Sequence, residues 1–399
     1  MRIIFSTDWY SEGMGYSENV LPQVFSRMGH EVYVISSTLQ VYGDHDFYEE
    51  VYGKFLGNAI VEPGTKIING VTVIRLPILV WWKRLKIAQS RTKTILNLKP
   101  DIVFAWDPRS YQTVLLSMAS VFHKFKLFSA VHTVASVYPA YYHFKSMSFF
   151  QKLRLRIFDT FIGWISSLRI EICYTNTIDS AEIATKFFGV KKDKVKFMPS
   201  SLDTNHFHPI MDKNDHCEKN SLRASLGISK ESILCIYSGR FTDAKNPKCL
   251  ADAINILRSN GHLYNAIFLG EGNQSEYIAF VDGCLIKSFI KYEELPKYYR
   301  AADIGVWPRQ ESISMSDATS CGIPIVVSNL MLAKDRIDGN GVTYSENDPI
   351  DLARILLDLR DKDLRFKLGS LGSKKIKENY SIDFIAEKYI LDFEKSMNL

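Results

Sequence analysis

Short apolar runs alternate with amphipathic stretches along most of this chain. Residues 2–6 read as a buried strand, residues 17–28 have the spacing of a helix that ends at a glycine, and residues 31–36 form the next apolar run. Residues 233–238 begin the same order again. Because strands that alternate with helices form parallel sheets with right-handed crossovers, the pattern predicts an α/β protein built from two such halves.

The length of 399 residues is more than one hydrophobic core usually supports, so we expect two domains. The first is predicted over residues 1–205, completed by a C-terminal helix at 381–399, and the second over residues 206–380. Hydrophobic residues make up 46% of the chain, which indicates large ordered cores. The polar run 211–220 is typical of a linker.

Charge and cysteine content narrow the function classes. The net charge of +5 is small for this length, so only local basic patches carry meaning, and we expect no nucleic-acid partner. The six cysteines are scattered without a CxxC pair or zinc-ligand spacing, which favours a reducing compartment. No apolar stretch is long enough to span a bilayer, and a strand follows Met1 directly, so we expect a cytoplasmic protein without a signal peptide.

The stretch 307–328 combines a strand, a loop with two acids, a helix start and a second strand. Glu311 lies before the predicted helix and is a candidate ligand for sugar hydroxyls, and Asp317 is a candidate for a second pair of hydroxyls. A helix N-terminus also offers free N–H groups to an anion. The alternative is an ordinary capped helix in which Asp317 is a solvated acid of the first turn.

Three other strand ends carry candidate chemistry. Gly13 and Gly15 follow the first strand, where glycine lets the backbone approach a phosphate, although such loops often only turn tightly. His132 ends the strand 127–131, where α/β sheets bind ligands, unless it is a buried structural histidine. Arg240 and Lys245 share one strand-to-helix loop and together are able to neutralise a diphosphate, unless they are ordinary surface cations.

Several of these motifs resemble the retaining glycosyltransferases of the GT-B fold, family 4. "SGRFTDAKNP" resembles the family's GR-F-x3-K signature, "DATSCGIPIVVS" its small-residue helix and Gly-x-Pro strand, and "GMGYSENVLP" its glycine loop. "FMPSSLDTNHFHP" is similar to the connection out of the first domain, and "SFIKYEELPKYYRAADIGVWP" to the region from the base-binding loop onward. The family's Glu-x7-Glu segment is two residues shorter here, and its second acid is Asp317.

The resemblance implies a GT-B architecture, with two Rossmann-like domains facing across a cleft and a last helix that crosses back to the first domain. It implies transfer of a sugar from a UDP-sugar or GDP-sugar to an acceptor hydroxyl with retention of configuration, without a metal or cofactor. His132 and Glu311 would act near the reacting carbon, and Ile290 would meet the nucleobase through its main chain. The donor-binding residues implied are Gly13, Gly15, Arg240, Lys245, Ile290, Ser312, Ile313, Ser314, Met315 and Asp317.

Other functions on the same fold stay open. A sugar-nucleotide epimerase would turn over the donor without an acceptor, and a phosphorylase would need a cofactor lysine. The shortened acidic segment is also compatible with a non-catalytic paralogue that binds a nucleotide-sugar.

Two basic segments of the first domain suggest a membrane. Residues 81–99 hold six cations and no acid, and residues 138–169 are rich in aromatic and basic side chains. Each segment is either a solvated or core-packed helix, or a surface for anionic lipid headgroups. On the second interpretation, the protein contacts the inner face of the cell membrane and its acceptor is lipid-linked. On the first interpretation, the acceptor is a soluble glycan.

Overall fold

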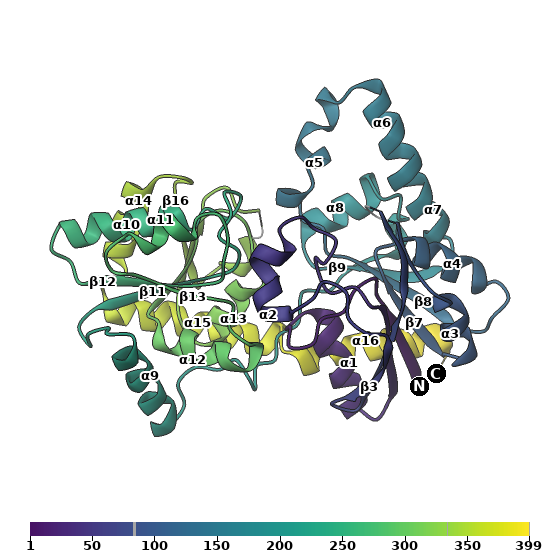
Figure 1. Cartoon of the computed structure of the whole chain (residues 1–399), viewed down its shortest axis with the longest axis horizontal. Helices are drawn as coiled ribbons and strands as arrows, with labels where there is room; N and C mark the ends of the chain where they lie inside the picture. Colours follow the sequence, from purple (N-terminus) through teal and green to yellow (C-terminus); the bar gives the residue numbers. More distant parts are fainter. Residues whose placement is uncertain (83–84, 333, 399) are drawn as a thin grey trace. The chain divides into compact units, whose positions relative to one another are not determined.

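The computed structural model describes residues 1–82, 85–332 and 334–398, and it divides into two compact units (Figure 1). The first unit comprises Met1–Glu49, Leu56–Ser201 and Ile382–Leu399. The second comprises Glu50–Phe55 and Leu202–Ser381. Each is an α/β unit with its own parallel sheet, as the alternation of strands and helices predicts.

The first unit is built on a sheet with the strand order β10-β9-β8-β7-β1-β2-β4-β3, in which only β3 runs antiparallel to its neighbour. Asn69 and Gly70, both with positive φ, form the β3–β4 turn, as the Asn-Gly pair predicts. The strands are β1 (Arg2–Ser6), β2 (Glu31–Ser37), β3 (Gly64–Ile68), β4 (Val71–Leu76), β7 (Ile102–Trp106), β8 (Lys126–Val131), β9 (Ile170–Thr175) and β10 (Val195–Phe197).

Helices cover both faces of this sheet, and the last helix of the chain is one of them. α16 (Ile382–Met397) packs Phe393 against Phe25 and Phe128 in the core. Its buried Asp392 accepts hydrogen bonds from Tyr174 on β9 and Lys196 on β10. The other main helices are α1 (Ser17–Arg27), α3 (Arg91–Asn97), α4 (Tyr111–Ala119), α5 (Ala140–His143), α6 (Phe149–Leu155), α7 (Ile162–Ser167) and α8 (Ile178–Lys186).

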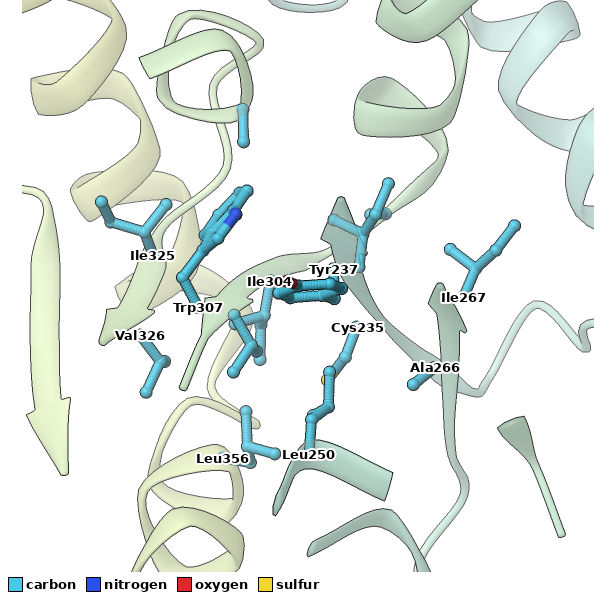
Figure 2. Packing of buried hydrophobic residues seen from close by; sticks show 14 of the residues in the cluster. Cys235, Tyr237, Leu250, Ala266, Ile267, Ile304, Trp307, Ile325, Val326 and Leu356 are labelled. Atoms are coloured by element: carbon cyan, nitrogen blue, oxygen red, sulfur yellow. The ribbon is translucent and has the colours of Figure 1, made fainter. Parts of the chain in front are cut away.

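The second unit has a six-stranded parallel sheet of order β13-β12-β11-β14-β15-β16. Its strands are β11 (Ile233–Ser238), β12 (Tyr264–Leu269), β13 (Cys284–Lys287), β14 (Ile304–Trp307), β15 (Ile325–Ser328) and β16 (Gly341–Tyr344). Its helices are α9 (Lys213–Ser225), α10 (Lys248–Ser259), α11 (Ser275–Ala279), α12 (Leu295–Ala301), α13 (Ser314–Ser320), α14 (Pro349–Asp358) and α15 (Lys362–Asn379). Figure 2 shows Trp307 and Tyr237 among the aliphatic side chains of this core.

The linker predicted at 211–220 is wrong, because that run begins the helix α9. Asp212 caps the helix through the N–H of Asp215. The buried Arg223 then fixes it by donating to the carboxylate of Asp303 and to three backbone carbonyls. The polar composition of this run therefore belongs to a surface helix, which one buried arginine holds in place.

The basic helix predicted at 81–99 is also wrong. The segment contains the antiparallel hairpin of β5 (Ile78–Trp82) and β6 (Leu85–Ala88), followed by the short helix α3. Lys86 is buried and pairs with Asp44, and Arg91 is buried and pairs with Asp8. These two cations therefore form ion pairs inside the unit and are not part of its surface. Lys83 and Arg84, which were predicted to belong to the same basic surface, lie outside the described residues.

Candidate active site

The candidate donor site lies at the carboxyl edge of the second sheet, between β11 and β14. From β11 the chain adds β12 and β13 on one side, and then β14 and β15 on the other. The order of the strands therefore reverses at the β11–β14 pair, and ligands of open α/β sheets bind at such a point. The loop 239–247 follows β11 and carries Arg240 and Lys245, and the loop 308–313 follows β14 and carries Glu311.

Two glycines that follow β12 let the chain there pack closely against the loop after β11. Gly270, at the end of β12, has φ of 142°, and a Cβ there would collide with the carbonyl oxygen of Gly239. Gly272 has φ of 151° and leaves no room for a Cβ beside the backbone of Phe241. The two loops consequently touch through their backbones, and the hydroxyl of Tyr237 donates to the carbonyl oxygen of Arg240 at 2.8 Å.

Hydrogen bonds join the loop after β14 to the end of β11. The indole N–H of the buried Trp307 donates to the carbonyl oxygen of Ser238 at 3.2 Å and to the hydroxyl of Ser314 at 3.1 Å. The Ser314 hydroxyl also bonds to the Ser238 carbonyl at 3.1 Å, and it lies 2.8 Å from the hydroxyl of Ser312. Ser312 and Ser314 thus fix the start of α13 against β11, and both of their hydroxyls already have protein partners.

Lys245 connects the two loops directly, because its ammonium group donates to the backbone carbonyl oxygen of Glu311. Burial and the positive charge of Arg240 lower the pKa of Lys245 to about 8, with a further lowering contribution from Arg336, although Glu311 acts in the opposite direction. Arg336 also donates to the carbonyl oxygen of Ser312 at 3.5 Å. Three cations and one carboxylate therefore gather at the predicted site.

Asp317 is buried, with 7% of its surface exposed, so the alternative of a solvated first-turn acid is wrong. Within the part of the chain that the structure describes, its carboxylate makes no hydrogen bond, and its oxygens keep some contact with solvent. Burial raises the pKa of Asp317 to about 8. Its negative charge also contributes, after burial, to the raised pKa values of Tyr292 and Tyr299, which places the carboxyl group near both phenols. A buried carboxyl without a partner is costly and is typical of a ligand-binding position.

The other predicted donor-binding residues of the second unit differ in what they offer. Ile313 is exposed, whereas the Met315 side chain is completely buried in the core, so only its main chain is left for a donor contact. Ile290 lies three residues after the end of β13 and packs partly against the same core. Ser312 is half-buried beside Ser314.

The remaining predicted residues belong to the first unit, at the carboxyl edge of its sheet. Gly13 follows β1 and has φ of 78°, a conformation that favours glycine, whereas Gly15 does not have a positive φ. His132 follows β8 directly, is exposed, and has its ring centroid 5.6 Å from that of Trp106. The alternative of a buried structural histidine is therefore wrong.

Arg336 is the site residue that sequence reasoning missed. It lies in a short 3-10 turn, Lys334–Arg336, that follows β15. Because β15 is the neighbour of β14, the loop after it opens at the same sheet edge as Glu311. A cation in the loop after β15 would have indicated this residue. That indication can be used only when β15 is known to lie beside β14.

The described residues lack two other features that bear on the function. They contain no group of three or more His, Cys, Asp and Glu side chains that is arranged to hold a metal ion. In the same ranges, no helix has both the length and the apolar character that a membrane span requires.

Part of the second unit matches a known family. Residues 232–362 match the family model "Glycosyl transferases group 1". A D-inositol 3-phosphate glycosyltransferase from Xylanimonas cellulosilytica is 25% identical over 52% of this chain and 53% of its own length. A UDP-Gal:alpha-D-GlcNAc-diphosphoundecaprenol alpha-1,3-galactosyltransferase from Escherichia coli is 27% identical over 55% of this chain and 59% of its own length. The match thus spans little more than half of these relatives.

Solved structures share the fold of the whole chain. Sucrose-phosphate synthase from Thermosynechococcus elongatus matches with a TM-score of 0.72 at 14% identity, covering 100% of this chain and 99% of its own. Anabaena HepE in complex with UDP matches with a TM-score of 0.71 at 15% identity over 100% of both chains. The protein therefore has the GT-B fold and carries a glycosyl transferases group 1 domain over residues 232–362.

Proposed function

We propose that the protein is a retaining glycosyltransferase, which moves a sugar from a nucleotide-diphosphate-sugar to an acceptor hydroxyl. The observation that carries this proposal is the group of Arg240, Lys245 and Arg336 at the β11–β14 switch point, with Lys245 bonded to the backbone of Glu311. A diphosphate is the ligand whose charge such a group of cations matches. The complexes of Anabaena HepE with UDP and with UDP-glucose support this assignment.

In the proposed mechanism, the cations stabilise the charge that develops on the diphosphate as the glycosidic bond breaks. Positive groups that are already in place need no reorganisation at that moment, and this is where electrostatic catalysis gains most. Lys245 is held by a carbonyl oxygen, which leaves its positive charge uncompensated by that bond. We assign no metal to this task, because the three cations supply the same charge.

The two acids have different proposed roles. Asp317 has a buried carboxyl without a partner, and two ribose hydroxyls would satisfy it. Glu311 precedes α13 and would accept from hydroxyls of the transferred sugar, and His132 of the first unit would act near the reacting carbon. Because we assign no nucleophilic carboxylate, retention would come from front-face attack assisted by the leaving phosphate.

Nucleotide binding is tested by thermal unfolding with UDP, GDP, ADP and UMP. A diphosphate present at 100 times its dissociation constant should stabilise the protein by about 2.7 kcal/mol, and UMP should do less because it lacks one phosphate. Arg240→Ala should remove most of this shift. If none of the diphosphates stabilises the wild-type protein, the proposed function is wrong.

Transfer itself is tested with the nucleotide-sugar that stabilises best. We expect the released or transferred sugar to keep the anomeric configuration of the donor, as read by NMR, and the rate to survive EDTA. Loss of the rate in EDTA and its return with magnesium would contradict the proposed role of the cations. Binding without any turnover would favour a non-catalytic paralogue.

The acceptor is proposed to be a glycan or a lipid-linked sugar, in the synthesis of a cell-surface glycan, glycolipid or polysaccharide. The name of the Escherichia coli relative, which specifies a diphosphoundecaprenol-linked sugar, supports this choice. A cytoplasmic enzyme at the inner face of the membrane would meet such an acceptor.

A further inference from the structure

One long helical segment of the first unit has its polar face inside and its apolar face outside. It consists of α6, the π-helical turn Arg156–Phe161 and α7, and it begins with a capping box at Ser148. In Figure 1 it rises beyond the end of the sheet of its unit. A helix on the surface of a water-soluble domain normally has the opposite arrangement.

The inner face is small and polar. The carboxylate of Asp159 is buried and lies 2.6 Å from the guanidinium of Arg109. Gly163 has no room for a Cβ because the carbonyl oxygen of Phe188 touches it. Ser166 and Ser167 are buried next to it, and the hydroxyl of Ser117 donates to the carbonyl oxygen of Ser166. This face is therefore committed to the unit and cannot turn outward.

The outer face carries large apolar side chains. Eight of them are at least 41% exposed, namely Phe149, Phe150, Leu153, Ile157, Phe158, Phe161, Trp164 and Leu168. Most are spaced by four residues, which would drift around an ordinary α-helix. The π-helical turn holds an additional residue and so limits this drift, which keeps the row on one side. The alternative of a core helix with a polar outer face is therefore wrong.

Cations border this apolar row, and exposed acids are missing from it. Lys145, Arg154 and Arg156 are exposed, and the one acid of residues 140–169 is the buried Asp159. Outside this range, Glu171 pairs with Lys126 at 3.1 Å. A surface that is both apolar and positively charged complements the interface of an anionic bilayer.

We propose that this outer face docks the protein on an anionic lipid bilayer without spanning it. The aromatic and leucine side chains would enter the boundary between headgroups and acyl chains, and Arg154, Arg156 and Lys145 would contact lipid phosphates. A second copy of the chain fits this face less well, because pairing two such faces would bring the same cations together. The hairpin at 78–88 contributes no charge through Lys86, which is buried against Asp44.

The test is flotation of the purified full chain with vesicles, which requires no enzymatic activity. Wild type should float with vesicles of equal parts phosphatidylglycerol and phosphatidylcholine, and much less with phosphatidylcholine alone. The variant Phe150→Ser/Phe158→Ser/Trp164→Ser should stay at the bottom of the gradient. Since these side chains are exposed, its thermal unfolding should match that of wild type, which separates lost docking from misfolding.

A charge variant and a matched control sharpen the result. Arg154→Gln/Arg156→Gln should lower the partition coefficient by about thirtyfold. Each cation near an anionic surface strengthens binding by about five- to sixfold, and the effects of the two arginines multiply. Phe280→Ser/Phe366→Ser removes two aromatic side chains of the second unit that are 84% and 75% exposed, and this variant should float like wild type.

Three results would overturn the proposal. Wild type that remains unbound to anionic vesicles refutes it, and so does a triple serine variant that floats as well as wild type. Sedimentation of wild type as a dimer that the triple variant abolishes, without flotation, would instead assign the face to contact between copies. These measurements involve neither nucleotide binding nor sugar transfer. The docking proposal and the proposed function can therefore be refuted independently of each other.

Discussion

Lys245 provides the sharpest test of the candidate site, because its charge changes within an accessible pH range. Burial and Arg240 lower its pKa to about 8, whereas an unperturbed lysine titrates near 10.5. A bound diphosphate would favour the charged form and raise that pKa again. Nucleotide binding above pH 8 should therefore take up a proton, and affinity should fall as the pH rises.

The size of the effect follows from this pKa. About nine tenths of the Lys245 side chains are charged at pH 7, and about one tenth at pH 9. If the complex keeps Lys245 charged throughout, the affinity should fall by about tenfold between pH 7 and pH 9, or about 1.4 kcal/mol. Lys245→Arg keeps its charge at every pH of this range and should lose this slope.

The assay is calorimetric titration of the best-binding diphosphate between pH 7 and pH 9, and the result is the ratio of wild-type to Lys245→Arg affinity. Taking the ratio cancels the titration of the ligand and of Asp317, whose pKa is also raised to about 8. Equal slopes for both proteins would refute the placement of Lys245 beside the diphosphate. A lower affinity of the arginine variant at pH 7 would not refute it, because an arginine at this position would not reproduce the hydrogen bond of Lys245 to the Glu311 carbonyl oxygen.

Three further predictions concern the same site. Arg240→Ala and Arg336→Ala should each weaken diphosphate binding by about 10- to 150-fold in calorimetry, the loss of a charge-assisted hydrogen bond, whereas Arg309→Ala, whose guanidinium pairs with Glu346, should bind normally. Glu311→Gln should reduce the transfer rate more than Asp317→Asn does, and the reverse order would mean that the two roles are exchanged. Asp317→Asn should raise Tm at pH 8 but not at pH 4. The folded pKa of Asp317 lies above its ordinary 3.8, so the carboxyl makes folding less favourable as pH rises from about 4 to 8, and unchanged Tm at pH 8 would contradict its burial.

The fold was accessible from the sequence, since buried strands and amphipathic helices differ in period. The two loops of the candidate site could also be found, because Arg240, Lys245 and Glu311 directly follow strong apolar runs. Arg336 could not, since its relation to Glu311 exists only once β15 lies beside β14. Strand order depends on contacts between residues far apart in the chain, and local patterns do not contain it.

Charged residues were the least predictable part of the chain. Lys86 and Arg91 read as surface cations, yet both are buried in ion pairs. The run that begins at Lys213 reads as a linker, yet Arg223 anchors it as a helix. In each case an acid far away in the sequence pairs with the cation and decides where it lies. Composition alone therefore predicts wrongly which cations are on the surface.

Apolar side chains are usually buried and charged ones exposed, and Asp317 and the helix of Phe158 depart from this rule in opposite directions. Asp317 is an acid that is buried without a partner, and Phe158 belongs to a row of apolar side chains left in water. Both arrangements cost stability, and neither is repaired by another contact among the described residues of its neighbourhood. Sequence patterns assume the rule, so they left a solvated acid and a core helix open as alternatives. A local rule that the native structure breaks without compensation most often marks a functional position. That reasoning leads to a ribose for Asp317 and to a lipid surface for the helix, and each can be tested without the other.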